Sequence, residues 1–141
     1  MNKDGELCYG MAGAGRATEL HMNALKRYSG VPVCFKRIIA RREEQVHAAR
    51  DRYGFQEASL SFDDLLNDEE IDIIDVCTPP YLHQSMVVAA LRAGKHVICE
   101  KPLTGYFGGP GDVPPIGDTV SKTVMYRELL RQLEQLRAEI R

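Results

Sequence analysis

Two glycines near the N-terminus have the spacing that phosphate binding requires. The segment from Gly13 to Thr18 (GAGRAT) follows a short apolar run, and Thr18 stands where the usual fingerprint has a third glycine. Gly13 would permit a tight turn, and Gly15 would let the backbone approach a pyrophosphate. The helix start at Arg16 and Ala17 would offer free N–H groups and a partial positive charge to the anion. The segment therefore predicts a dinucleotide-phosphate site, the alternative being that small residues merely permit close packing at this turn.

Two arginines follow the second strand-like segment, where related folds select between NAD and NADP. NAD-preferring folds place an acid there to bind the ribose 2′-hydroxyl, whereas NADP-preferring folds leave room for an arginine beside the 2′-phosphate. Here Arg41 and Arg42 follow Ala40, and no acid occurs between Glu19 and Glu43. Guanidinium groups bind a dianionic phosphate with a forked set of donors. The pattern favours NADP, with NAD possible; two solvated arginines at the start of a surface helix are the alternative.

Polar residues also follow the fourth and fifth strand-like runs. Thr78 and Pro79 come directly after the fourth run and are followed by His83, and Glu100 and Lys101 come after the fifth. The carboxyl ends of parallel strands meet at one edge of a sheet, where ligands bind in open α/β folds. We therefore expect these residues in the second half of the same pocket. Taken singly, the lysine is more typical of an exposed loop and the histidine of a solvated helix start.

Strand-like and helix-like segments alternate along the first hundred residues. Glycines at 54 and 94 stop two of the helices, and Ser61 with Asp64 predicts a capping box for a third. Strands separated by helices indicate βαβ units with right-handed crossovers. The sequence thus predicts an α/β fold with a doubly wound parallel sheet, a Rossmann dinucleotide-binding fold of three α/β/α layers. The expected strands are 7–12, 31–40, 58–60, 71–77 and 96–99, and the expected helices are 16–28, 43–53, 61–67, 80–94 and 121–141.

Two of these helices carry an apolar stripe, and a loop of unusual composition separates the last one from the rest. Residues 101–120 hold five of the 12 glycines and four of the seven prolines, which predicts a long irregular loop that is functional or mobile. In helix 16–28, Leu20, Ala24 and Leu25 share one face. We expect the stripe of helix 121–141 to pack on the sheet rather than on a partner. That stripe consists of Leu129, Leu133, Leu136 and Ile140.

The composition excludes several classes of protein. The chain has 141 residues, 44% hydrophobic and 27% charged, which suits one globular domain over residues 1–141. Lys and Arg number 18 and Asp and Glu 20, a balance that argues against nucleic acid as the main partner. The longest run without a charged residue, from Val76 to Leu91, falls short of the roughly 20 apolar residues of a membrane span. The N-terminus carries acids and no apolar core, so we expect no signal peptide.

Four cysteines lie inside apolar, strand-like runs. No two form a CxxC pair, and no histidine lies at zinc-ligand spacing beside one. Because free cysteine is among the most often buried residue types, we expect four buried, reduced thiols and no metal site. Reduced thiols indicate the cytoplasm as the compartment. The four are Cys8, Cys34, Cys77 and Cys99.

Three motifs in this order resemble the Gfo/Idh/MocA family, the glucose–fructose oxidoreductase and inositol dehydrogenase group. The first is Gly13-x-Gly15 with His21 six residues later. The second is the segment TPPxxH that ends at His83, and the third and most specific is AGKHVxxEKP at 93–102. The resemblance covers the chain from about Glu6 to Thr104.

The resemblance implies an NAD(P)-dependent oxidoreductase that acts on sugars, cyclitols and related alcohols. It implies that the N-terminal Rossmann domain binds the cofactor, with Thr78, Pro79 and His83 lining the cofactor cleft. By the same pattern, Glu100 would lie near the nicotinamide ribose. Lys101 would face the nicotinamide and the substrate hydroxyl and aid proton movement as hydride transfers. A C-terminal domain would supply most substrate contacts and the interface of a possible homo-oligomer.

That C-terminal substrate domain is not within these 141 residues. We therefore expect the chain to bind NADP(H) and to turn over no sugar. The alternative is a non-catalytic nucleotide-binding module that acts through a protein partner. A binder of another adenine compound, such as a methyl donor, is disfavoured because Arg41 and Arg42 would have no phosphate to bind.

Overall fold

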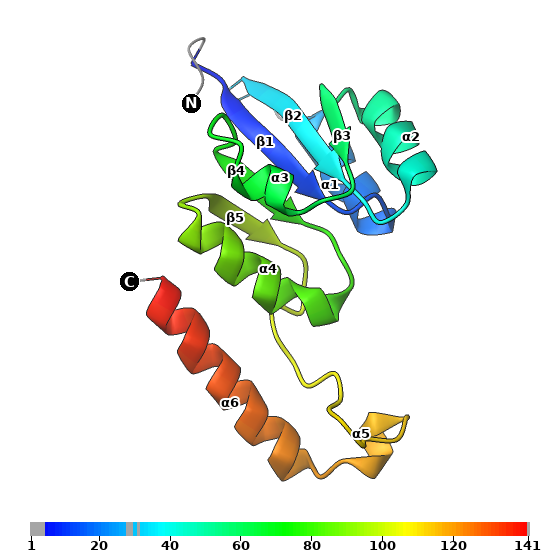
Figure 1. Ribbon diagram of the computed structural model, residues 1–141, viewed down its shortest axis with the longest axis vertical. Coiled ribbons are helices and arrows are strands. Elements are labelled where there is room, and N and C mark those ends of the chain that lie inside the picture. Colours follow the sequence, from blue (N-terminus) through cyan, green and yellow to red (C-terminus); the bar gives the residue numbers. More distant parts are fainter. Residues whose placement is uncertain (1–4, 28–29, 31, 141) are drawn as a thin grey trace.

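The computed structural model describes residues 5–27, 30 and 32–140 of the chain. At its centre is a sheet of five parallel strands in the order β3-β2-β1-β4-β5 (Figure 1). The chain enters at β1 in the middle, builds β2 and β3 on one side, and then crosses to build β4 and β5 on the other. The order therefore reverses between β1 and β4, which is the switch point of a doubly wound sheet. The strands are Leu7–Ala12 (β1), Val33–Ile39 (β2), Glu57–Ser59 (β3), Ile73–Val76 (β4) and His96–Cys99 (β5).

Helices cover both faces of this sheet, so the predicted three-layer α/β/α Rossmann fold is confirmed (Figure 1). On one face, Met22 and Val46 from the first two helices pack against Met11 of β1. On the other face, Leu65 and Val87 from the next two pack against strand residues of β1, β2 and β4. The helices are Arg16–Leu25 (α1), Glu43–Tyr53 (α2), Asp63–Leu66 (α3), Pro80–Arg92 (α4), Ile116–Thr119 (α5) and Lys122–Glu139 (α6).

Local signals set several boundaries as expected. α2 ends at Gly54, whose φ of 82° places it in the left-handed region that glycine adopts most readily. α4 begins with Pro80 in its first turn and stops before Gly94, which has a φ of 74°. Three predicted terminal residues lie outside the described residues: Tyr28 of the first helix, Val31 of the second strand and Arg141 of the last helix.

The predicted capping box of the short third helix is wrong. The residue that caps α3 is Phe62, without a side-chain hydrogen bond. Instead, the Ser59 hydroxyl at the end of β3 donates to the Asp64 carboxylate and accepts from the Ser61 N–H at 3.0 Å. The Ser59 hydroxyl thus lies between Ser61 and Asp64, the two residues that a capping box would have joined directly.

The predicted apolar face of the first helix is also wrong. Leu20 is 57% exposed and Ala24 is exposed, whereas Thr18 and Met22 are completely buried. The tight turn between β1 and α1 fixes the rotation of the helix about its axis. That rotation points the face with Thr18 and Met22 at the sheet, and Leu25 packs only at its edge.

The last helix packs on α4 and not on the sheet. Figure 1 shows α6 lying outside α4, and its buried contact is Leu136, which is 3% exposed. Arg92 of α4 pairs with Glu139 at 2.5 Å on the same side. Leu133 is 39% exposed, and Ile140, the last residue of the predicted stripe, is 70% exposed. α6 cannot reach the sheet because α4 already covers that face.

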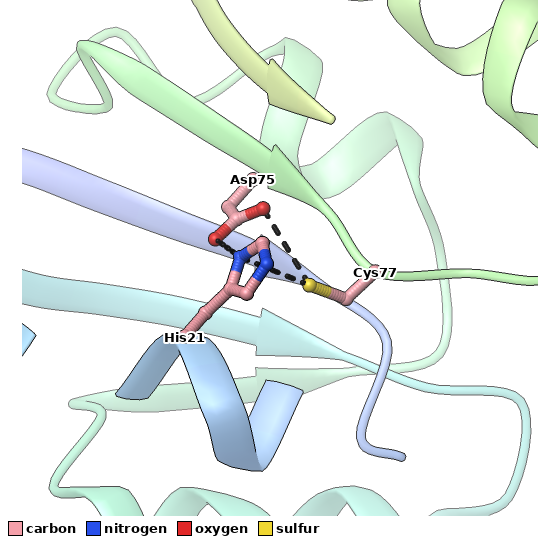
Figure 2. A group of neighbouring side chains, drawn as sticks. All are labelled: His21, Asp75 and Cys77. Carbon is pink, nitrogen blue, oxygen red and sulfur yellow. Dashed lines mark hydrogen bonds and ion pairs between the residues drawn. The ribbon is translucent and has the colours of Figure 1, made fainter. Parts of the chain in front are cut away.

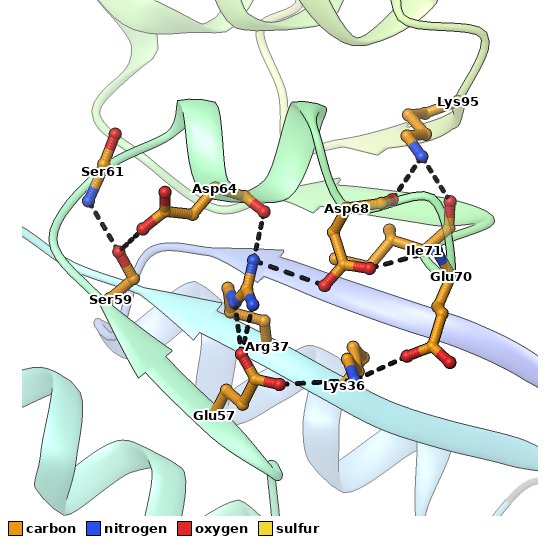
Figure 3. A network of polar contacts seen from close by, with 10 residues as sticks. All are labelled: Lys36, Arg37, Glu57, Ser59, Ser61, Asp64, Asp68, Glu70, Ile71 and Lys95. Atoms are coloured by element: carbon orange, nitrogen blue, oxygen red, sulfur yellow. Dashed lines mark hydrogen bonds and ion pairs between the residues drawn. The ribbon is translucent and has the colours of Figure 1, made fainter.

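Basic residues of β2 hold the connection that crosses the sheet between β3 and β4 (Figure 3). Arg37 donates to Glu57 of β3 from its Nε at 3.0 Å. Lys36 pairs with the same carboxylate at 3.3 Å and with Glu70 of the connection at 2.6 Å. Lys95 donates to two backbone carbonyls of the connection at 2.6 and 2.9 Å. These contacts fix the segment that carries one wall of the cleft described below.

The four cysteines are free, as predicted, but only two are fully buried. Cys8 and Cys77 are buried, whereas Cys34 and Cys99 are partly exposed.

Candidate functional site

A cleft of about 500 Å³ opens at the carboxyl edge of the sheet, where β1, β2 and β4 end. Five of the residues predicted to bind a dinucleotide line it: Gly13, Gly15, Arg41, Thr78 and Pro79. The cleft therefore lies beside the switch point, the position where open α/β folds bind ligands. The sequence did not single out several of its other lining residues, which include Gln45, Leu60, Phe62, Cys77 and Tyr81.

The two fingerprint glycines have different tasks in the structure. Gly13 has a φ of 119°, and a Cβ atom there would lie 2.4 Å from the carbonyl oxygen of Cys77. Gly15 has extended backbone angles at the start of α1, and a Cβ there would meet no atom of the described residues within 4 Å. Gly13 thus allows the β1–α1 turn to close on β4, and Gly15 leaves an open approach to the backbone.

The first residues of α1 follow this open approach. Arg16 is exposed, whereas the Ala17 side chain packs on the core of that face, so only the backbone of Ala17 is available to a ligand. The first N–H groups of any helix have no partner within the helix, and they carry partial positive charge. The turn therefore offers an anion-binding helix start beside a glycine without a side chain, which fits a pyrophosphate.

The structure separates the two arginines. Arg41 lines the cleft, whereas Arg42 caps α2 and bonds weakly to Gln45 at 3.4 Å, beside a second hollow outside the cleft. Gln45 in turn donates to the Ala14 carbonyl at 2.9 Å and so ties α2 to the glycine turn. Sequence reasoning missed Gln45, because a glutamine in the first turn of a helix is an ordinary surface residue.

His83 lies behind the cleft and does not line it. It is 1% exposed, and its ring lies between the carbonyl oxygens of Thr78 and Pro102, each 2.8 Å from a ring nitrogen. His83 therefore joins the turn after β4 to the segment after β5, the two segments whose polar residues were predicted to share a pocket.

Glu100 and Lys101 lie at the end of β5, next to the end of β4. The Glu100 N–H donates to the Val76 carbonyl at 3.0 Å, and the Lys101 N–H donates to the Glu100 side chain at 3.0 Å. Lys101 is exposed, and its peptide bond to Pro102 is cis. Neither Glu100 nor Lys101 is among the residues that line the cleft, although the turn adjoins it.

A buried polar cluster connects this turn to the core (Figure 2). The ring of His21 on α1 bonds Asp75 of β4 through Nδ1 at 2.7 Å and Glu100 through Nε2 at 3.1 Å. Asp75 is completely buried and also accepts a hydrogen bond from the Tyr9 hydroxyl. The Cys77 sulfur lies 3.4 Å from His21 Nδ1 and 3.5 Å from the other oxygen of Asp75.

The protonation of this cluster follows from burial and charge. Burial lowers the pKa of His21, but hydrogen bonds and charges from Asp75 and Glu100 outweigh that effect and raise it. Burial, and then the charge of Asp75, raise the pKa values of Tyr9 and Cys77, so both keep their protons. The Lys101 N–H, and then His21, lower the pKa of Glu100. The His21 ring therefore lies between two carboxyl groups, and its contacts with both raise its pKa.

His21, Asp75 and Cys77 are also the kind of ligand set that can hold a metal ion, with donor atoms within 4.8 Å of one another. The 2.7 Å separation of Nδ1 and Oδ2 is that of a hydrogen bond, and the three side chains satisfy one another. Sequence reasoning missed Asp75. The available signal was an aspartate inside a strand that is covered on both faces, where an unpaired charge is expensive.

A model of a known family, described as "Oxidoreductase family, NAD-binding Rossmann fold", matches residues 7–108. The chain belongs to the Gfo/Idh/MocA family. Among relatives, levoglucosan dehydrogenase of Pseudarthrobacter phenanthrenivorans is 33% identical over 103 residues, which is 67% of this chain and 26% of that protein. Myo-inositol 2-dehydrogenase of Thermotoga maritima is 30% identical over 95 residues, 67% of this chain and 28% of that protein.

Solved structures agree with this assignment. A levoglucosan dehydrogenase in complex with NADH and levoglucosan has a TM-score of 0.63 and 31% identity, over 70% of this chain and 28% of that one. An NAD-binding oxidoreductase from Klebsiella pneumoniae has a TM-score of 0.65 and 28% identity, again over 70% of this chain and 28% of that one. This Gfo/Idh/MocA chain spans about a quarter of the length of these relatives and corresponds to their NAD-binding Rossmann domain.

The family match ends at residue 108, so α5 and α6 lie beyond it. In the described part of the chain, no helix has the length and apolar character needed to cross a bilayer.

Proposed function

We propose that this chain binds NADP(H) in preference to NAD(H), as the cofactor-binding half of an oxidoreductase for a sugar, cyclitol or related alcohol. The observation that carries the proposal is the open glycine turn at Gly15, with Arg41 lining the same cleft. Relatives that bear the same fold bind NADH together with levoglucosan or L-sorbose.

Each part of the cleft suits one part of the cofactor. The pyrophosphate would lie against the backbone at Gly13 and Gly15, where the start of α1 supplies N–H donors. The adenosine ribose would reach the end of β2, where the Arg41 guanidinium would bind a 2′-phosphate. The nicotinamide half would extend toward Thr78 and Pro79, which lie on the side of the cleft nearest to the turn after β5.

Lys101 is the proposed catalytic residue. A bound nicotinamide supplies the group that accepts or donates a hydride. When a carbinol loses hydride, its O–H proton must leave as well, and an amine beside the oxygen can take it or stabilise the charge. Lys101 is exposed at the sheet edge, so its side chain is free to meet a substrate there. Because most substrate contacts in the family are expected from a second domain, we expect no sugar oxidation by these 141 residues alone.

The separation of the two arginines gives a direct test of the cofactor preference. The Kd for NADPH and for NADH would be measured by nicotinamide fluorescence at one fixed salt concentration. Arg41→Ala should weaken NADPH binding by about tenfold or more, the value of a charge-assisted hydrogen bond, and leave NADH binding nearly unchanged. Arg42→Ala, the matched control outside the cleft, should change either Kd by less than about threefold. Equal losses of NADPH and NADH binding in Arg41→Ala would overturn the NADP preference.

A second candidate is a nucleotide-binding module that acts through a protein partner. Exposed apolar side chains on the loop after β5 and on α6 favour it, among them Phe107, Val113 and Tyr126. Failure of the folded chain to bind either nucleotide would exclude both candidate functions.

A further inference from the structure

We propose that His21 is a positioning residue for the nicotinamide half of the cleft: as an imidazolium it ties Glu100 to buried Asp75 and so holds the Glu100–Lys101 turn in its binding shape. The inference rests on the proposed function, because it assigns the turn to the nicotinamide side. His21 itself does not line the cleft and would act only through Glu100.

The geometry requires protons on both ring nitrogens. His21 lies on α1, and its two nitrogens contact carboxylates from two other elements, Asp75 on β4 and Glu100 after β5, at 2.7 and 3.1 Å. An ionised carboxylate only accepts hydrogen bonds, so each of these contacts needs an N–H. A neutral ring has one N–H and can keep only one of the two contacts.

The contact that is lost on deprotonation is the one to Glu100. Asp75 is completely buried in the middle of the sheet and held by the Tyr9 hydroxyl, so it cannot move or find water. The Glu100 side chain is 23% exposed, at the end of its strand, and can turn to solvent. A neutral His21 would therefore keep its proton on Nδ1 for Asp75 and present a lone pair to Glu100.

Release of Glu100 would loosen Lys101. The carboxylate that accepts from the His21 ring also accepts from the Lys101 N–H, one contact through each oxygen. Glu100 is thus the link between the core and the backbone of the proposed catalytic residue. Arg41, on the adenosine side of the cleft, follows β2, which β1 and β4 separate from β5, so it should not respond.

The charges around the ring favour the imidazolium. Asp75 and Glu100 face it from β4 and the end of β5, and the thiols of Cys77 and Cys99 are close enough for their pKa values to be raised by these same carboxylates. Tyr9 faces Asp75 from β1. Among the described residues, the ion pairs of both carboxylates are with His21; the Lys101 N–H also bonds Glu100, but the charge of Lys101 acts on Glu100 more weakly than that of His21. The raised pKa of His21 places its deprotonation on the alkaline side of its ordinary value.

The test compares two ligands that differ only in the nicotinamide ring, the group that Lys101 is proposed to face. The Kd of NADPH and of 2′-phospho-ADP-ribose would be measured from pH 6 to pH 10 in the wild-type chain and in His21→Gln. Both ligands carry the same 2′-phosphate, so its own titration cancels in the ratio of the two Kd values. In the wild type, NADPH binding should weaken about tenfold as pH rises through the His21 pKa, the value of one charge-assisted hydrogen bond, while 2′-phospho-ADP-ribose binding should not.

His21→Gln should bind NADPH weakly at every pH and lack this pH dependence, with 2′-phospho-ADP-ribose binding unchanged. His96→Gln is the matched control. His96 is exposed at the amino end of β5, away from the carboxyl edge where the cleft opens, so this variant should retain the wild-type profile. A ligand-free measurement guards against a variant that folds poorly: the NMR titration of His21 in Glu100→Gln should show a lower pKa than in the wild type.

The inference is overturned if the two ligands weaken in parallel with pH, if His21→Gln keeps the wild-type profile, or if the His21 pKa is unchanged in Glu100→Gln. Failure of both ligands to bind at any pH, with the NMR titration as expected, would instead refute the proposed nucleotide binding.

Discussion

Replacing the two fingerprint glycines by alanine separates their roles. The sequence motif assigns Gly13 to the turn and Gly15 to the ligand, and in the structure only Gly13 of the two has a backbone conformation that L-residues rarely adopt. We expect Gly13→Ala to destabilise the fold. We expect Gly15→Ala to fold normally and to bind the dinucleotide poorly.

The magnitude follows from two effects at Gly13. A φ of 119° strains an alanine by about 1–3 kcal/mol. The new Cβ would also lie 2.4 Å from the Cys77 oxygen and 2.8 Å from its carbonyl carbon. That backbone cannot easily withdraw, because the Cys77 N–H is bonded to the Ala12 carbonyl at 2.8 Å, and overpacking of this kind costs a further ~1–3 kcal/mol. The sum is a large part of the roughly 7–20 kcal/mol expected for a domain of this size.

Gly15 has no such constraint. Its φ of −102° and ψ of −161° suit any residue, so alanine should change stability by less than about 1 kcal/mol, with a small gain from a stiffer unfolded chain. Its methyl group would, however, stand where the pyrophosphate must approach the backbone.

Urea unfolding followed by far-UV circular dichroism measures the free energy of unfolding of both variants, and nicotinamide fluorescence measures the NADPH affinity of those that fold. Our reasoning would be refuted if Gly13→Ala were as stable as the wild type, or if Gly15→Ala were the less stable of the two.

Three further predictions use the same unfolding assay. Leu136→Ala should lower the free energy of unfolding by about 2–3 kcal/mol, because this side chain anchors α6 on the core, whereas half-exposed Leu133→Ala should cost less than about 1 kcal/mol; similar losses would contradict the packing described. Thr18→Val should raise stability by about 1 kcal/mol, because the buried hydroxyl makes no well-formed hydrogen bond among the described residues and has only the weakly polar Cys77 thiol as a neighbouring partner; a loss would show that the thiol satisfies the hydroxyl. The hydrogen bond from Arg37 lowers the pKa of Glu57, so its stabilising effect is complete above the ordinary pKa near 4.5 and is lost as the pH falls through the lower, folded-state value. Glu57→Gln should therefore flatten the acid side of the stability profile, and an unchanged acid side would rule this pair out as its source.

Short-range signals in the sequence were sufficient for the strands, for the described helices other than α5, and for the type of fold. Gly54 and Gly94 mark helix ends because only a residue without Cβ adopts their backbone angles freely, and Pro80 marks a helix start because its missing N–H costs nothing there. Alternation of apolar strands with helices was enough to predict a parallel, doubly wound sheet. The glycine motif predicted a turn that lines the cleft, for the same reason.

The tertiary structure decided which neighbours in sequence share a site. Arg41 and Arg42 are adjacent, yet one lines the cleft and the other caps a helix, because the rotation of α2 is set by packing across the sheet. His83 followed a cleft segment in sequence but is buried between two carbonyls behind it.

The cluster around Asp75 depends most completely on the tertiary structure. His21, Asp75 and Glu100 come from a helix and two strands, and 54 and 79 residues separate His21 from its two partners. The sequence by itself determined the elements, because glycine, proline and apolar periodicity act over a few residues. Only the folded sheet determined this cluster, because the strand order places the ends of β4 and β5 beside α1. A buried charged group such as Asp75 needs a partner, and its partner is a side chain that these elements bring within reach, here His21.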